Sequence, residues 1–265
     1  MRPRAPGTQR TPWLAVATVL TAVAAGGLSG CSTTTDPTPR TSAPVDRSTS
    51  PGATIPGTAV TLSRLPLVDD SRPVLSAGGV LAARRELPTD VWTPAGSGPF
   101  PLVVFVHGYD TGPLDYRRFC STLASAGYVV AAPSFPLEDP ARGFPLDRTH
   151  LADEAADVTF VISAIDQRDS PRVDRSRVAV VGHSDGADVT LLVGYGAGTV
   201  DPHVGAVVAD APDPMAVTAV PSAVPLLLVQ GTSDSVVPYS ASQTVFSQVD
   251  APVSYVSLIG ADHLP

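Results

Sequence analysis

One five-residue pattern constrains the fold of this chain more than any other feature of its sequence. The run Val178–Val181 is apolar and mostly β-branched, as expected of a buried strand, and leads directly into Gly182-His-Ser-Asp-Gly186. A helix-like segment, Ala187–Val193, follows at once. A strand that turns this sharply into a helix forces the residue at the turn into a strained backbone conformation. The glycines omit side chains that would collide there, and Ser184 is held next to the positive end of the helix.

The chain from residue 59 onward alternates strand-like and helix-like segments. Strands are expected at 85–92, 101–106, 128–132, 178–181, 205–209, 225–229 and 253–259, and helices at 113–126, 149–167, 187–193 and 239–249. Because most of these strands are apolar throughout, they are expected to form a mostly parallel sheet with helices on both faces. The functional site of such a sheet lies beyond the carboxyl ends of its strands, which is where Ser184 falls.

A serine hydroxyl becomes a useful nucleophile when a base and an orienting acid lie within hydrogen-bond reach. His263 follows the last expected strand and is the candidate base. Asp234 follows the strand at 225–229 and is the candidate acid, with Asp210, at the end of the preceding strand, as the alternative. An oxyanion would be bound by the backbone N–H groups of Tyr109 and Asp185. A negative side chain at 185 would oppose that charge, so we expect it to point away or to pair with an arginine.

The other four histidines are expected to have structural roles. His183 precedes the candidate nucleophile and should point away from it, and His107 opens the loop after the strand at 101–106. His150 and His203 lie in a loop or at a helix start without a supporting motif, so a solvated or capping role is expected for both.

The first 58 residues are predicted to carry an address and a tether rather than part of the fold. Three arginines precede an apolar run, Trp13–Ala25, that is too short to span a bilayer comfortably. Leu28-Ser-Gly-Cys31 resembles a bacterial lipobox, which predicts a signal peptide at 1–30 and lipidation of Cys31; the alternative is an ordinary secretory signal. Residues 31–58 are rich in Ser, Thr and Pro and cannot bury a core. The sequence therefore predicts a hydrolase-like domain at 59–265, exported and held at the cell surface by a membrane anchor.

Composition narrows the possible partners. The formal net charge is -8 at pH 7, which argues against nucleic acid as a partner. Neither a cluster of metal-ligand residues nor a phosphate-binding loop is present, so we predict no metal and no cofactor. We expect a monomer. The second cysteine, Cys120, lies in a helix-like pattern and is expected to be a buried structural thiol.

Four motifs in a fixed order give the chain a family resemblance. They are His107-Gly-Tyr109, Gly182-His-Ser-Asp-Gly186, Gly231-Thr-Ser-Asp-Ser-Val-Val-Pro238 and Gly260-Ala-Asp-His263. From about residue 60 to 265 the chain resembles the serine α/β hydrolases, in which the triad order is Ser, Asp, His. The segments 70–73 and 87–94 are similar to the first strands of the dienelactone-hydrolase-like branch, which includes bacterial cutinases and platelet-activating-factor acetylhydrolases.

This resemblance implies hydrolysis of carboxylic esters through an acyl-enzyme on Ser184, with Asp234 and His263 completing the triad. The membrane address favours lipid or hydrophobic esters. Relatives commonly have a neutral residue where this chain has Asp185, and they usually continue into a covering helix where this chain ends. Either the sequence is a fragment or one face of its sheet is less covered than usual.

Two other functions stay open. The same fold could cleave peptide, amide or thioester bonds, or the protein could be a surface lipoprotein that binds without catalysis. The presence of all three triad residues argues against the second alternative.

Overall fold

The computed structural model describes residues 57–169, 172–213 and 219–263. The predicted signal peptide at 1–30, Cys31 and the tether as far as residue 56 lie outside the described residues. No helix in the described ranges has the length and apolar character needed to cross a bilayer.

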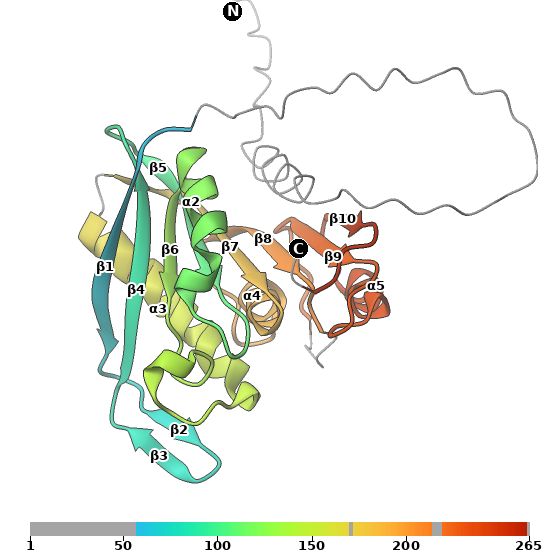
Figure 1. Ribbon diagram of the computed structural model, residues 1–265, viewed down its shortest axis with the longest axis horizontal. Helices are drawn as coiled ribbons and strands as arrows, with labels where there is room; N and C mark the ends of the chain where they lie inside the picture. Colours follow the sequence, from blue (N-terminus) through green and yellow to red (C-terminus); the bar gives the residue numbers. More distant parts are fainter. Residues whose placement is uncertain (1–56, 170–171, 214–218, 264–265) are drawn as a thin grey trace, which may run out of the picture.

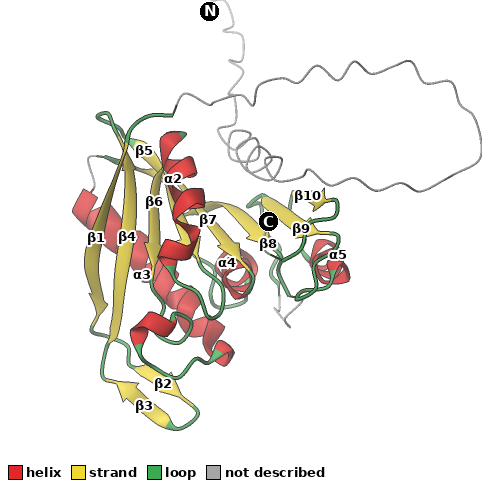
Figure 2. Ribbon diagram, in the orientation of Figure 1, coloured by secondary structure: helices red, strands yellow, loops and turns green. Residues whose placement is uncertain are grey.

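An eight-stranded sheet forms the centre of the domain (Figure 1; Figure 2). Its spatial order is β1-β4-β6-β5-β7-β8-β9-β10. The strands are β1 (Val60–Asp69), β4 (Arg85–Pro94), β5 (Phe100–Val106), β6 (Val129–Pro133), β7 (Val173–His183), β8 (Val204–Asp210), β9 (Leu226–Gly231) and β10 (Val253–Leu258). The strands from β6 to β10 in this order pair in parallel, whereas β1 with β4 and β4 with β6 pair antiparallel. The predicted mostly parallel sheet is confirmed. The short strands β2 (Val74–Ser76) and β3 (Gly79–Ala82) form a separate antiparallel pair.

Helices pack on both faces of the sheet, as the apolar strands predicted. Alternate residues of β5 point to opposite faces, so Val104 and Val103 belong to two different core clusters. The cluster with Val104 is covered by α3 (Leu151–Asp169), α4 (Asp185–Tyr195) and α5 (Tyr239–Gln248). The cluster with Val103 is covered by α2 (Arg117–Ser125), which contributes the buried Cys120. Burial raises the pKa of that thiol above its ordinary range, which fits the expected structural role.

Strand β1 (Val60–Asp69) was not among the strands expected from the sequence. The starts of α2 and β7 also differ from the expected ones. The helix expected at 113–126 begins as a 3-10 turn, Pro113–Tyr116, before α2. Strand β7 begins at Val173, five residues before the expected start, and a register shift interrupts its pairing with β5. Of the five added residues Val173 is buried, but residues 174–177 are polar and none of them is buried, so they lack the apolar signal that marks the rest of the strand.

Candidate active site

Ser184 forms the sharp turn between β7 and α4. Its φ of 56° and ψ of -127° lie in a backbone region that residues other than glycine rarely adopt. A Cβ atom on Gly182 would lie 2.1 Å from the carbonyl oxygen of Gly186, and one on Gly186 would lie 2.2 Å from that of Val106. Any side chain at either position would push the strand and helix apart. The Ser184 N–H donates to the carbonyl oxygen of Asp210 at 2.9 Å, which fixes the turn against β8.

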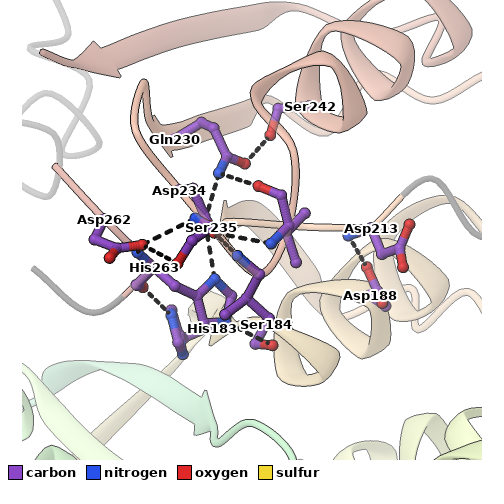
Figure 3. Close-up of polar contacts among 12 residues, drawn as sticks. His183, Ser184, Asp188, Asp213, Gln230, Asp234, Ser235, Ser242, Asp262 and His263 are labelled. Atoms are coloured by element: carbon purple, nitrogen blue, oxygen red, sulfur yellow. Dashed lines mark hydrogen bonds and ion pairs between the residues drawn. The ribbon is translucent and has the colours of Figure 1, made fainter. Parts of the chain in front are cut away.

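His263 and Asp234 meet Ser184 beyond the ends of β10 and β9 (Figure 3). His263 Nε2 lies 3.0 Å from Ser184 Oγ, and His263 Nδ1 lies 2.9 Å from Asp234 Oδ2. The side chain of Asp234 is fully buried and that of His263 is 12% exposed. When Nδ1 carries the proton and donates it to Asp234, Nε2 is free to accept the Ser184 hydroxyl proton.

The carboxylate of Asp234 receives several hydrogen bonds. Its Oδ1 accepts from the backbone N–H groups of Val236 and Val237, and its Oδ2 accepts from Gln230 Nε2 at 2.7 Å. Burial opposes ionisation, but the hydrogen bonds from His263 and the two backbone amides outweigh it and lower the pKa of Asp234. Asp234 is therefore held as an ionised acceptor facing the imidazole.

Asp210, the alternative acid, lies at the end of β8. Burial, followed by the charge of Asp234, raises the pKa of Asp210 to about 7. Its main-chain oxygen supports Ser184, and it is Asp234 that contacts the Nδ1 of His263. The structure thus brings together Ser184, His263 and Asp234.

The two candidate oxyanion donors come from two different segments, the loop after β5 and the start of α4. Asp185 opens α4, so its N–H belongs to the first-turn amides that have no carbonyl partner within the helix. Tyr109 follows Gly108, and a Cβ on Gly108 would lie only 3.1 Å from Ser184 Cβ. The buried ring of His107 links this loop to a neighbouring segment. It accepts a hydrogen bond from the Phe135 N–H and donates one to the Gly108 carbonyl.

The side chain of Asp185 pairs with an arginine, which is one of the two arrangements expected from its charge. Arg148 donates from Nε to Oδ2 at 3.0 Å and from a terminal nitrogen to Oδ1 at 2.5 Å. The carboxylate is 3% exposed and the Arg148 side chain 53%. Burial raises the pKa of Asp185, and the hydrogen bond and charge of Arg148 counteract that rise. The acid next to the candidate nucleophile is therefore partly neutralised from the loop before α3.

Three further buried acids near Ser184 were not identified from the sequence. Glu138, Glu154 and Asp188 are at most 1% exposed. Both carboxylate oxygens of Glu138 and Glu154, and Oδ2 of Asp188, have no hydrogen-bond partner among the described residues. Burial and neighbouring carboxylates raise the pKa of Glu138 and of Asp188 to about 8, and raise the pKa of Glu154 well above its ordinary range.

In the described ranges, no group of three or more potential ligands is arranged to hold a metal ion.

A family model described as Chlorophyllase matches residues 82–236, which is more than half of the chain. The chain belongs to the chlorophyllase family. The matched part of this chlorophyllase-family protein includes Ser184 and Asp234 and ends before His263.

Among curated relatives, the chloroplastic Chlorophyllase-1 of Citrus sinensis is 32% identical over 117 residues, which are 42% of this chain and 34% of that protein. Esterase FrsA of Yersinia pestis is 32% identical over 124 residues, 46% of this chain and 27% of that protein. The matches span about a third or less of the length of these relatives.

Solved structures share the fold of this chlorophyllase-family chain. A putative dienelactone hydrolase from Klebsiella pneumoniae has a TM-score of 0.58 at 20% identity, covering 78% of this chain and 88% of its own. A ferulic acid esterase from Streptomyces cinnamoneus has a TM-score of 0.59 at 21% identity, covering 79% and 75%. Together with the family match, these likenesses confirm the α/β-hydrolase fold and the serine hydrolase superfamily that the motifs predicted.

Proposed function

We propose that this protein is a serine hydrolase that cleaves carboxylic esters, with Ser184, His263 and Asp234 as its catalytic triad. The observation that carries the proposal is the continuous hydrogen-bonded chain Ser184–His263–Asp234, with contacts of 3.0 Å and 2.9 Å. A nucleophile, a base and an orienting acid in this sequence of contacts are what acyl transfer requires.

The proposed reaction begins with attack of Ser184 Oγ on the carbonyl carbon of the ester, while His263 Nε2 takes the hydroxyl proton. The N–H groups of Tyr109 and Asp185 donate to the oxyanion; removal of one such donor typically costs about 10²–10³ in rate. The intermediate then expels the alcohol, which receives its proton from His263, and leaves an acyl group on Ser184. Water, activated by the same imidazole, releases the acid. Asp234 holds the ring orientation and stabilises the imidazolium throughout.

An ester is favoured over the other bonds that this fold can cleave. The matching relatives are named as a chlorophyllase and an esterase, and neither name points to a peptide or thioester. Lipid or hydrophobic esters form the finer part of the proposal. They are supported by the lipobox-like Leu28-Ser-Gly-Cys31, which would anchor the exported protein to a membrane surface through lipidated Cys31.

Labelling with a fluorophosphonate probe tests the proposed nucleophile. We expect the intact protein to be labelled and to hydrolyse p-nitrophenyl esters, and Ser184→Ala to lose labelling and about 10⁴-fold or more of kcat. Ser240→Ala, at an exposed position of α5, is the matched control and should behave as the wild-type protein. Absence of labelling in the folded wild-type protein would overturn the proposal. Faster turnover of matched amide or peptide substrates than of esters would favour a peptidase or amidase.

A further inference from the structure

The residue before the nucleophile makes hydrogen bonds that the triad does not explain. His183 is 5% exposed. Its Nε2 lies 2.8 Å from the main-chain oxygen of His263, and its Nδ1 lies 2.9 Å from the hydroxyl of Tyr116. Figure 3 shows the contact between His183 and the His263 main chain. The rings of His183 and His263 also pack, with centroids 4.7 Å apart.

The partners of His183 define which of its nitrogens carries the proton. A carbonyl oxygen only accepts, so Nε2 must be the donor to His263. Nδ1 is then the acceptor, and the hydroxyl of Tyr116 donates to it. Burial lowers the pKa of His183 to about 4, so the ring is neutral near pH 7. Tyr116 is fixed in turn, because its ring packs on Phe105 with centroids 4.7 Å apart.

The main chain around His263 is otherwise attached to a different loop. The Gly260 N–H donates to Thr232, the Ala261 carbonyl accepts from the Ser233 N–H, and the Asp262 carboxylate accepts from Ser235. All of these contacts tie residues 260–262 to the loop that carries Asp234. They fix the base relative to the acid but leave its placement against Ser184 to other contacts.

We propose that His183 is a positioning residue, which holds the main chain of His263 at the distance from Ser184 that proton transfer requires. The inference rests on the proposed function and adds a role that the triad alone does not contain. His183 is covalently next to Ser184, so its hydrogen bond to the His263 carbonyl fixes the base directly against the strand that carries the nucleophile. Tyr116 supports this role by orienting the ring, and its hydroxyl also lies 3.4 Å from the N–H of Gly108 in the loop of the oxyanion donor.

A matched set of substitutions separates the hydrogen bond from simple filling of space. The amide nitrogen of a glutamine reaches as far from the main chain as His Nε2, whereas that of an asparagine reaches only as far as Nδ1. We expect His183→Gln to keep kcat within about threefold of wild type and His183→Asn and His183→Leu to lower it about 10–100-fold, since an error of about 1 Å in placement can cost about 10² in rate. KM should change by less than about threefold, because the contact acts on the transition state. Tyr116→Phe should lower kcat by a smaller factor, about 2–10-fold.

Crystal structures of the same variants give a readout that does not depend on catalysis. We expect the Ser184 Oγ to His263 Nε2 distance to stay near 3.0 Å in wild type and in His183→Gln, and to lengthen in His183→Asn and His183→Leu. Unchanged kcat in the asparagine and leucine variants, or an unchanged distance, would overturn the positioning role. Equal losses in the glutamine and leucine variants would do the same. If wild type cleaves no ester but His263 moves in the leucine variant, the positioning role stands and the proposed function fails.

Discussion

Two sets of buried carboxyl groups near Ser184 have pKa values shifted in opposite directions. Asp234, beyond β9, accepts hydrogen bonds from a histidine, a glutamine and two backbone amides, and its pKa is lowered. Glu138 before α3, Glu154 in α3 and Asp188 in α4 each have at least one oxygen without a partner among the described residues, and their pKa values are raised. Asp188 Oδ1 accepts one hydrogen bond, from the Asp213 N–H. Burial is close to complete in both sets. The hydrogen bonds that Asp234 receives outweigh the effect of its burial, whereas the three acids of the second set receive too few donors to offset theirs.

Asp185 stands between these two cases. Its side chain is nearly as buried as those of the second set, but Arg148 donates two hydrogen bonds to it. Both side-chain hydrogen bonds that Arg148 makes in the described structure go to Asp185, and its charge only partly offsets the rise in the pKa of Glu138 and Asp188. The difference between these carboxyl groups thus depends on particular hydrogen-bond donors, which single substitutions can remove.

The largest effect is expected from neutralising the well-hydrogen-bonded acid. Asp234→Asn removes the charge that stabilises the imidazolium. Its amide oxygen would stay with the Val236 and Val237 N–H groups, so an NH2 group would face His263 Nδ1 and favour the wrong tautomer. We therefore expect kcat for p-nitrophenyl esters to fall by about 10³–10⁴. Asp210→Asn is the control, because a buried carboxyl whose pKa is raised to about 7 is already mostly neutral below that pH. It should change kcat by less than about threefold. The reverse order of effects would assign the acid to Asp210.

An intermediate effect is expected when the paired acid loses its partner. Arg148→Met removes both hydrogen-bond donors to the Asp185 side chain, so the pKa of Asp185 should rise further. At alkaline pH, where the unpaired group ionises beside the site of the oxyanion, kcat/KM should fall about 10–100-fold. Adding Asp185→Asn should restore activity to within about threefold of wild type, because the repulsive charge is then gone. Arg142→Met, in the same loop but bonded to the Glu86 main chain, should leave kcat/KM near the wild-type value. A double variant no better than Arg148→Met would show that the arginine acts other than through Asp185.

Much of the fold could be predicted because its signals are local. The apolar runs located β5, β6, β8, β9 and β10 within one or two residues. The collision argument for Gly182 and Gly186 matches distances of 2.1 Å and 2.2 Å in the structure. The polar start of β7 was missed because residues 174–177 gain strand structure only from pairing with neighbours. The antiparallel pairing of β4 likewise depends on which strands meet in space.

The kind of partner that a site residue needs could be predicted from its chemistry. The identity of that partner could not be predicted where it comes from a loop, because the course of a loop is not encoded in a local pattern. A carboxylate beside an oxyanion implied that Asp185 points away or pairs with an arginine, but not that Arg148 would be that arginine. Glu154 carried a usable signal, because it shares the helix spacing of the buried Leu151, Ala155 and Val158. Glu138 lies in a loop without periodicity, so its burial could not be read. The expectation that His183 points away from the nucleophile said nothing of the His263 main chain that it contacts.

The smallest effect is expected when one acid of the second set is replaced, and it is an effect on the free energy of unfolding. The pKa of Glu138 is raised from 4.5 to about 8 in the folded protein, so between these values the folded chain binds more protons than the unfolded chain. The free energy of unfolding contributed by this group therefore falls as pH rises from about 4.5 to about 8. Glu138→Gln removes the ionisation, and we expect the unfolding free energy of this variant to exceed that of wild type by about 1–2 kcal/mol at about pH 8.5, with little difference at about pH 5.

Urea unfolding at the two pH values measures this difference directly. Glu86→Gln is the matched control, because its side chain is 52% exposed and its substitution should leave the pH dependence unchanged. A glutamine at 138 that destabilises the protein equally at both pH values would mean that Glu138 has a donor in solution. Glu138 would then belong with Asp234 in the first set, and only Glu154 and Asp188 would remain in the second.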